Sequence, residues 1–517
     1  MTTGSPRGRE ISTFKGQDRA LRAGRVGTTG LLLSVAAASA PMMVVAGAMP
    51  TAYAVMGIVG QPLLFVILGA VLMLFSVGYA EMGRHVQNAG AFYAYIARGL
   101  GGTVGTAASV VALVAYSTLQ VGLYGIFGFE VAGLLDEHLG VRLNWWVPAL
   151  AGVLVVGVLG RLKIDLHVTV LGVLLLVEVA LVAVFAVAGV GDPGPEGVSW
   201  HAFDPETLTG AGLGTALCFC IAAFTGFEQS PVYAEETARP QVVVARVMFL
   251  AVGCAALLFA LGSWAFGVAA GPSNVVAMAQ AQGPHLLFTL TEDRLGAAFA
   301  NLMHVFYVTG MFAAMLTFHN VVARYAFAMG REGLLPAAFG RTTETGGAPG
   351  HGSVLQTLVS VAVVTTFTLS DDRGPGDATT PVLHLFTWTG NMGALGIMAL
   401  MATASVAVIA FFVRRGAVRT QLPRIACSGL AAAALIVIIC CAVKDFDVLL
   451  ATDPHPALRW ILPGVVGATI AVGVGYGLLL RAFRPRVHAG IGKGNEAFQL
   501  EKVATARDGA STPPTAA

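Results

Sequence analysis

The feature that most constrains this chain is a series of twelve long apolar stretches. In the hydrocarbon of a bilayer every backbone N–H and C=O must be paired within its own segment, so a helical crossing takes about 20 mostly apolar residues. Only 11% of the 517 residues are charged, against about 25% in soluble proteins, which excludes a soluble fold. We therefore predict an all-α integral membrane protein with 12 transmembrane helices. The stretches are residues 28–47, 62–80, 104–134, 145–159, 166–190, 211–232, 242–270, 297–322, 354–369, 381–413, 425–443 and 460–480.

The distribution of basic residues indicates how these spans are oriented. Residues 1–26 form a polar, basic tail that differs from a cleavable signal peptide. If this tail is cytoplasmic, alternate loops place all but five of the 30 Lys and Arg residues on the same side. Because Lys and Arg concentrate in cytoplasmic loops, we predict a protein of the cytoplasmic membrane with both termini in the cytoplasm. The five exceptions are Arg142, Arg294, Arg373, Lys444 and Arg459.

Four regions follow from this topology. Residues 27–415 hold the first ten spans, and 416–486 hold the eleventh and twelfth, which we expect at the periphery. Residues 1–26 and 487–517 are rich in Gly, Pro, Ser and Thr with little to bury, so both are predicted to be disordered cytoplasmic tails. The expected partners are the lipid bilayer and a small molecule, and the chain is expected to be a monomer or a homodimer.

Composition and motifs argue against several functions. The net charge of +2 gives no electrostatic basis for binding nucleic acid. The six Cys residues lie inside apolar runs and the His residues lack ligand spacing, so no disulfide framework, metal site or cofactor is expected. We find no Gly-x-Ser-x-Gly motif and no large domain outside the membrane, so we do not expect an enzyme. A polytopic membrane enzyme and a non-transporting solute sensor are kept as alternatives.

Two of the spans contain residues that interrupt a helix near mid-membrane depth. In the first span, the small residues 38–40 precede Pro41, which removes a helical hydrogen bond and clashes with the preceding turn. In the sixth span, Gly226 and Glu228 fall about halfway along, and Pro231 follows within one turn. We therefore predict that both helices open at these positions.

Opened helices at these two positions have a chemical consequence. One half-helix end exposes N–H groups and the other exposes C=O groups, so a break can bind a carboxylate and an ammonium. Spans one and six are equivalent positions if spans one to five and six to ten are inverted repeats with a solute site at their interface. We therefore predict a site for a zwitterion between the breaks. The alternative is that Pro41 is a tolerated kink and Gly226 a packing contact.

Residues around the second break resemble the amino acid/polyamine/organocation (APC) superfamily of permeases. The most specific stretch is Phe-Thr-Gly-Phe-Glu at 224–228, followed by Tyr-Ala-Glu-Glu at 233–236 and Val-Ala-Arg at 244–246. A second stretch, Ala-Met-Gly-Arg-Glu-Gly-Leu-Leu-Pro at 328–336, is similar to the family's cytoplasmic loop after the eighth helix. The resemblance covers roughly residues 27–415.

The resemblance implies a five-plus-five inverted-repeat fold and secondary transport of amino acids or organic amines by alternating access. A bacterial amino acid permease is the expected type, and a polyamine or organic-amine importer of the same fold is the alternative. Two departures matter. The first break has Ala-Ser-Ala at 38–40 where many members have glycines, and Thr169 stands where several bacterial relatives place a lysine. Coupling to a proton or to Na+, and simple solute exchange, are therefore left open.

Thirteen residues are candidates for solute binding, coupling or gating. The solute carboxylate is expected at backbone N–H groups of the first break, and its ammonium at carbonyls of the second. Aromatic rings can close over an ammonium, and a carboxylate at mid-membrane depth is functional by default. The predicted solute-binding residues are Ala38, Ser39, Ala40, Pro41, Gln120, Ala223, Phe224, Thr225, Gly226 and Trp388, and the predicted coupling or gating residues are Thr169, Phe227 and Glu228.

Several of these assignments have a structural alternative. Gln120 can hydrogen-bond either the solute or a neighbouring helix, and Trp388 can be a core residue. Glu178 lies on the opposite helix face from Thr169, so we expect it to serve a different neighbourhood. A hydrogen bond to another helix is the expected role of Glu178, and a part in coupling is the alternative.

Two connecting segments are expected to act as gates. The loop at 271–295 is more apolar than a flexible connector and is predicted to fold as short helices over the outer vestibule. The aromatic residues Phe92, Tyr93 and Tyr95 lie in the inner segment 81–100. Their rings are expected to plug the inner mouth in one state of the protein.

Overall fold

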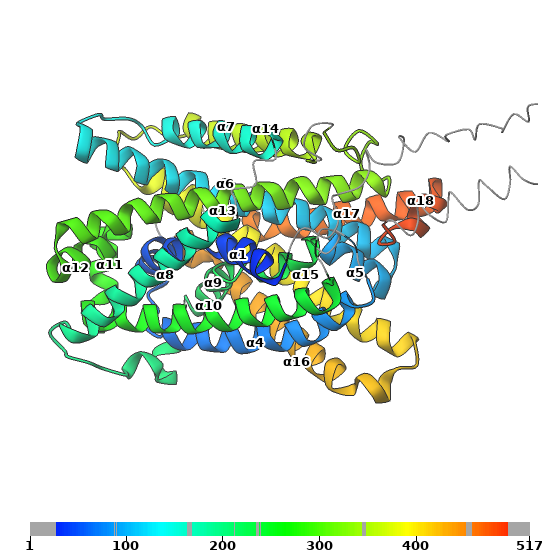
Figure 1. Ribbon diagram of the computed structural model, residues 1–517, viewed down its shortest axis with the longest axis horizontal. Coiled ribbons are helices and arrows are strands. Elements are labelled where there is room, and N and C mark those ends of the chain that lie inside the picture. The colour runs from blue at the N-terminus through cyan, green and yellow to red at the C-terminus, as the bar shows by residue number, and fades with distance from the viewer. Residues whose placement is uncertain are drawn as a thin grey trace, which may run out of the picture.

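The computed structural model describes most of the chain between residues 27 and 494, and every regular element within that part is a helix. The long helices run along the long axis of the molecule (Figure 1). The predicted tail at 1–26 lies outside the described residues. The residues that the structure describes are 27–86, 88, 90–162, 168–210, 212–233, 237, 239–343, 348–450 and 457–494.

Ten helical stretches of the described chain are long and apolar enough to cross a membrane. The two remaining predicted spans correspond to shorter helices, α7 (Trp146–Leu162) with 17 residues and α9 (Leu213–Ala222) with 10. The all-α membrane class is therefore confirmed, whereas the helix lengths of the described chain do not confirm the count of twelve. The ten comprise Thr28–Met56, α4 (Gln61–Gly83), α6 (Gly102–Leu139), α8 (Val168–Gly191), α10 (Pro240–Ala270), α13 (Ala297–Arg331), α14 (Gly350–Leu369), α15 (Thr387–Arg414) with the preceding π-helical turn η8 (Thr379–Phe386), α16 (Val418–Lys444) and α17 (Leu458–Phe483).

The first crossing is interrupted where the sequence predicts it. α1 (Thr28–Ser39) ends at Ala40, whose backbone is left-handed with φ 34°. α2 (Pro41–Met43) then begins with Pro41, a position where the missing N–H and fixed φ of proline suit a helix start. Ala40 therefore separates the end of one half-helix from the start of the next. The crossing is completed by the π-helical turn η3 (Val44–Ala48) and by α3 (Met49–Met56).

The sixth span is also interrupted at its predicted position. α9 ends at Ala222, and a turn leads into the 3-10 helix η6 (Phe227–Tyr233). Gly226 in this turn has φ 131°, a backbone conformation that residues with a side chain rarely adopt. Pro231 lies inside η6, where it cannot donate the backbone hydrogen bond that a continuous α-helix requires. The two predicted openings are thus both present.

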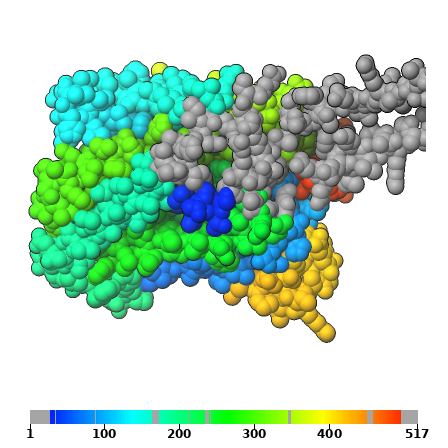
Figure 2. Space-filling model, in the orientation of Figure 1, coloured from blue at the N-terminus to red at the C-terminus, as the bar shows by residue number. Residues whose placement is uncertain are grey.

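The half-helix α1 lies among elements from distant parts of the sequence. It contacts α8, α10 and α13 as well as η6. Figure 1 shows α1 and α9 in the middle of the bundle, with α13 on one side and α10 on the other. Figure 2 shows dark-blue α1 reaching the surface of one face between teal α8 and green α10. The tertiary fold therefore brings the first break against the second.

The segments predicted to act as gates are helical. The loop at 271–295 contains α11 (Val275–Gln282) and α12 (Leu286–Leu295), so the expected short helices are present. At the opposite end of the bundle, α5 (Ala91–Leu100) carries the buried rings of Phe92, Tyr93 and Tyr95. Figure 1 shows α11 and α12 at one end of the long axis and α5 at the other.

The chain remains ordered beyond the predicted start of the C-terminal tail. α18 (Pro485–Gly490) follows α17, and the N–H groups of Gly492 and Gly494 both donate to the Glu332 carboxylate at 2.9 Å. These bonds position the part of the predicted tail between residues 487 and 494. They link it to a residue about 160 positions away, which composition does not reveal.

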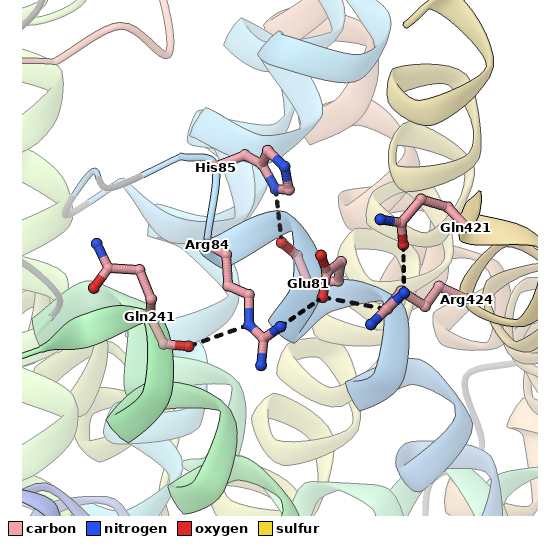
Figure 3. Close-up of polar contacts among 6 residues, drawn as sticks. All are labelled: Glu81, Arg84, His85, Gln241, Gln421 and Arg424. Carbon is pink, nitrogen blue, oxygen red and sulfur yellow. Dashed lines mark hydrogen bonds and ion pairs between the residues drawn. The ribbon is translucent and has the colours of Figure 1, made fainter. Parts of the chain in front are cut away.

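Spans eleven and twelve lie at the periphery but are fastened to the core. The buried share of the most apolar part of the helix is 78% for α6, but only 33% for α16 and 22% for α17. Figure 3 shows the contact of α16 with α4: Glu81 Oε2 accepts from Arg84 Nη1 at 3.2 Å and forms an ion pair with Arg424 Nε, also at 3.2 Å. Arg84 Nε also donates to the Gln241 carbonyl at 3.3 Å. These contacts tie α4, α10 and α16 together at one end of the bundle.

Candidate functional site

The two helix breaks are in direct contact. A Cβ atom added to Gly226 would lie 2.6 Å from the Val35 carbonyl oxygen and 2.9 Å from the Ala38 Cβ. Such distances are too short for any side chain, so the turn of the sixth span approaches the end of α1 closely only because residue 226 is glycine. The site therefore depends on Gly226 for both its backbone angle and its proximity to the first break.

A cavity lies between the breaks and takes one wall from each. Ala38 and Ser39 line it from α1, and Ala223 and Thr225 line it from the turn after α9. The remaining walls are mostly apolar, and no charged side chain occurs among the residues that line it in the described structure. Polar recognition in this cavity therefore falls mainly to the backbone. The larger side chains lining it are Met43, Leu119, Leu123, Phe219, Phe318 and Phe386.

The hydroxyl groups in this cavity are turned toward their own helices. Ser39 Oγ donates to the Ala36 carbonyl at 2.8 Å, and the Thr225 hydroxyl donates to the Ala222 carbonyl. Each oxygen keeps lone pairs that can accept a hydrogen bond from a solute. The last carbonyl groups of α9 accept hydrogen bonds from the N–H groups of residues 223–225, and a carbonyl oxygen has two lone pairs, so they can accept a further bond. This side of the cavity is suited to an ammonium or another N–H donor.

A glutamate from α8 occupies the start of the second half-helix of span one. Glu178 is only 3% exposed, and its Oε2 accepts from the Met42 N–H at 3.2 Å. Ala40 and Pro41 line a small hollow beside this carboxylate, and Gly310 of α13 lies so close that an added Cβ would be 2.5 Å from Glu178 Oε1. The expected bond from Glu178 to another helix is present. Because this partner belongs to the first break, Glu178 lies beside the candidate site.

A second glutamate accepts hydrogen bonds at the break in span six. Glu228 is fully buried; its Oε2 accepts from the Gly226 N–H and its Oε1 from the Tyr116 hydroxyl, both at 2.8 Å. The partner of Glu228 that the sequence could not identify is thus Tyr116 of α6. An N–H group at each break therefore already donates to a carboxylate of the protein.

Below Glu228 an aromatic cluster fills the end of the bundle that carries α5. The Tyr116 ring lies 5.5 Å from that of Tyr325, and Tyr79 contacts the rings of Tyr95 at 4.8 Å and Phe92 at 5.3 Å. All five side chains are at most 1% exposed. Phe227 extends the cluster, because its ring meets Phe75 edge to face at 6.0 Å. The rings of Phe92, Tyr93 and Tyr95, which were expected to close this end of the bundle, are packed within the cluster.

Six of the ten predicted solute-binding residues lie outside the lining of the central cavity: Ala40, Pro41, Gln120, Phe224, Gly226 and Trp388. Phe224 packs against Phe65 and Phe259, on α4 and α10, at 6.1 and 5.9 Å between ring centroids. Trp388 stacks on His384 at 4.3 Å. Gln120 Nε2 donates to the Tyr124 hydroxyl at 2.9 Å.

Gln120 also belongs to a wider network. Its Oε1 accepts from Gln356 Nε2 of α14 at 2.7 Å, so it joins a neighbouring helix, one of the two roles expected for it. Thr169 belongs to α8, but its side chain lies outside the described residues. The described residues contain no cluster of three or more His, Cys, Asp or Glu side chains that could hold a metal ion.

Three aromatic residues of the cavity, Phe219, Phe318 and Phe386, were not among the site residues predicted from the sequence. Phe219 precedes Ala223 by four positions on α9, so helical spacing alone places both on one face and could have identified it. Phe386 ends the π-helical turn η8, and the extra residue per turn in such a segment changes which side chains face the cavity. For Phe386 the sequence carries no comparable signal.

The sequence matches the family described as amino acid permease over residues 31–464. It is 26% identical over 305 residues to the low-affinity putrescine importer PlaP of Escherichia coli, covering 57% of this chain and 61% of the importer. It is 25% identical over 299 residues to the branched-chain amino acid permease BcaP of Bacillus subtilis, covering 54% and 62%. The methylthioribose transporter of the same species is 24% identical over 316 residues, covering 58% and 66%. Each alignment spans less than two thirds of the relative.

Solved structures share the fold. The manganese transporter of Eremococcus coleocola, in complex with an aromatic bis-isothiourea compound, matches with a TM-score of 0.55 at 10% identity. The match covers 89% of this chain and 97% of the transporter. A structure of a mutant of that transporter gives a TM-score of 0.51 at 12% identity, covering 86% and 93%. At these identities the likeness concerns the fold alone, and it confirms the expected APC-type transporter fold. From the extent of the family match, this chain belongs to the amino acid permease family.

Proposed function

We propose that this protein carries a small amino acid or a related amine across the cytoplasmic membrane by alternating access. The observation that carries the proposal is the cavity between the two breaks, with Ala38 and Ser39 on one wall and Ala223 and Thr225 on the other. Half-helix ends at such a cavity present carbonyl groups to a cation and N–H groups to an anion. Family membership supports transport as the activity.

The solute is held mainly by backbone groups. Its ammonium meets the carbonyls that end α9 near 223–225, and its apolar part packs among Phe219, Phe318 and Phe386. A carboxylate on the solute lies at the start of α2, the positive end of this half-helix, next to Ala40 and Pro41. The closed aromatic cluster between α5 and Tyr116 supports a cycle in which this inner mouth opens as the helices rock. The driving ion is a proton or Na+, or the protein exchanges one solute for another.

A second candidate is an amine that has no carboxylate. Glu178 already accepts from the Met42 N–H, and Glu228 already accepts from the Gly226 N–H. An ionised Glu178 would repel a solute carboxylate at the first break, and it would attract a second ammonium. The similarity to a putrescine importer supports this candidate, and the similarity to a branched-chain amino acid permease supports the first.

Counterflow in proteoliposomes tests both candidates. Vesicles preloaded with an unlabelled solute are diluted into the labelled solute, and accumulation is measured for leucine, alanine, isopentylamine and putrescine. Accumulation of the amino acids supports the first candidate, and accumulation of the amines alone supports the second. Binding without accumulation would identify a sensor and contradict transport. Imposed proton and Na+ gradients then identify the coupling ion.

A further inference from the structure

A second cavity, distinct from the candidate solute site, opens at the end of the bundle that carries α5. Its walls come from the end of α5, the start of α6, the end of α15 and the segment around α18. In Figure 1 these elements gather at the α18 end of the long axis, far from α11 and α12. The residues that line it include Arg98, Gly102, Arg414, Arg415, His488 and Lys493.

The charged side chains that line this cavity are all basic. Three arginines, one lysine and His488 line it, and no acidic side chain occurs among its lining residues in the described structure. Gly101 and Gly102 also form the wall where α6, a helix of 38 residues, begins. The N–H groups at a helix start carry partial positive charge, so the helix adds to the field of the basic side chains. The cavity is therefore built to attract an anion.

Contacts within the protein position two of the basic side chains, and each side chain keeps N–H donors that can bind an anion. Arg414 Nη1 donates to the Gly99 carbonyl at 2.8 Å, and the Arg415 guanidinium lies 4.1 Å over the Phe411 ring. A guanidinium has five N–H donors, so neither contact exhausts it. Phosphate oxygens suit this geometry, because a planar guanidinium can donate to two of them at once.

The C-terminal wall of the cavity is fixed in place. Glu332 Oε1 accepts from Asn88 Nδ2 at 2.8 Å and from the Gly494 N–H at 2.9 Å, and Glu332 Oε2 accepts from the Gly492 N–H at 2.9 Å. Thr103 Oγ1 lies 3.0 Å from His488 Nε2. These bonds hold Lys493 and His488 opposite the arginines of α5 and α15. The segment beyond α17 is therefore a necessary wall of the cavity, and these hydrogen bonds hold it in place.

We propose that this cavity binds a phosphate-bearing anion, either the headgroup of an anionic phospholipid or a soluble phosphate compound. Basic pockets between helices at the cytoplasmic side of a membrane suit phospholipid headgroups, and the predicted orientation puts this cavity on that side. Phe411 and Ile491 line it beside the charges and offer an apolar surface for the start of an acyl chain. The bound anion joins α5, α15 and the C-terminal segment.

The test compares two double variants of the full-length protein in detergent. Arg415→Gln with Lys493→Gln removes two charges from the cavity. Arg419→Gln with Arg486→Gln removes two exposed charges that do not line it. The probes are dioctanoyl phosphatidylglycerol, dioctanoyl phosphatidylcholine and sodium pyrophosphate at constant ionic strength. The melting temperature and the binding affinity are measured for each protein with each probe.

We expect the phosphatidylglycerol or the pyrophosphate to raise the melting temperature of the wild type and of the control variant. In the cavity variant the affinity should fall about thirtyfold, because each basic residue near an anionic headgroup contributes about fivefold. Stabilisation by phosphatidylglycerol alone identifies a lipid site, and stabilisation by pyrophosphate identifies a site for a soluble phosphate compound. An equal effect in both variants, or no effect beyond that of phosphatidylcholine, would overturn the proposal. The melting temperatures without probe verify that both variants fold.

Discussion

Glu178 of α8 accepts a hydrogen bond from the backbone N–H of Met42 at 3.2 Å, so a carboxylate from the fifth span sits at the start of the half-helix that follows the first break. The N–H groups at a helix start favour a negative charge. A residue 136 positions away therefore supplies a hydrogen-bond acceptor to the start of this half-helix. This relationship connects the shape of the first break to the charge state of Glu178.

Replacing Glu178 with Gln keeps the side-chain shape and removes the charge. We expect the helix start to lose about 1 kcal/mol of stabilisation, and the preference for amines over zwitterionic amino acids to fall about tenfold or more, because the carboxylate no longer repels the solute. The ratio of counterflow rates for isopentylamine and leucine measures this change. Glu206→Gln, at an exposed position in η5 (Pro205–Leu208), is the control. An unchanged ratio would show that Glu178 has only a structural role.

Replacing Gly226 with Ala should abolish transport without preventing membrane insertion. The new Cβ would lie 2.6 Å from the Val35 carbonyl oxygen, and the φ of 131° costs about 1–3 kcal/mol for a residue with a side chain. Gly467→Ala in α17 is a matched control, because its Cβ would meet no atom within 4 Å. Uptake is measured per amount of monodisperse protein. Normal uptake by Gly226→Ala would mean that the close approach of the breaks is dispensable.

Removing the hydroxyl of Tyr116 should disturb the second break. Tyr116→Phe leaves Glu228 Oε1 without its donor at 2.8 Å, and loss of a hydrogen bond to a buried charged group costs about 1.5–3 kcal/mol. We expect a lower melting temperature and an altered dependence of uptake on external pH. Glu228→Gln should flatten that dependence, because the amide cannot titrate.

The control for this pair is Tyr476→Phe. Tyr476 donates to the Leu334 carbonyl at 2.8 Å, far from the breaks, so its loss should leave the pH dependence of uptake as it is in the wild type. If Glu228→Gln also retained the wild-type pH dependence, Glu228 would be a static bond acceptor with no part in coupling.

Attachment of the C-terminal segment should weaken as pH rises. Burial raises the pKa of Glu332, although the donors from Gly492, Asn88 and Gly494 and the charge of Arg331 partly offset this effect. The docked segment therefore favours the protonated carboxyl: its attachment is strongest below the ordinary Glu pKa of about 4.3 and declines as pH rises through the raised value.

Limited proteolysis of the segment that follows α17 measures this attachment. Cleavage of the wild type should become faster with rising pH after correction for the activity of the protease. Glu332→Gln cannot ionise, so its corrected cleavage rate should vary little with pH. A variant with the same pH dependence as the wild type would place the titrating group elsewhere.

Local chemistry explains which parts of the site could be predicted. Pro41 and Gly226 act on the backbone at their own positions, so both breaks could be located from the sequence. The orientation of neighbouring side chains was harder. Successive residues of a helical turn point about 100–120° apart, so Ala223 and Thr225 line the cavity while Phe224 turns to α4 and α10.

The sequence by itself determined the membrane class, the apolar spans and the positions where two of them open, because each depends on residues that are adjacent in the chain. Only the tertiary structure decided that Glu178 caps the first break, that Tyr116 holds Glu228 and that Glu332 anchors the C-terminal segment. Those contacts join residues more than 100 positions apart, and they depend on how each helix is rotated and placed against its neighbours. Apolar periodicity does not encode that rotation when nearly every face of a membrane helix is apolar.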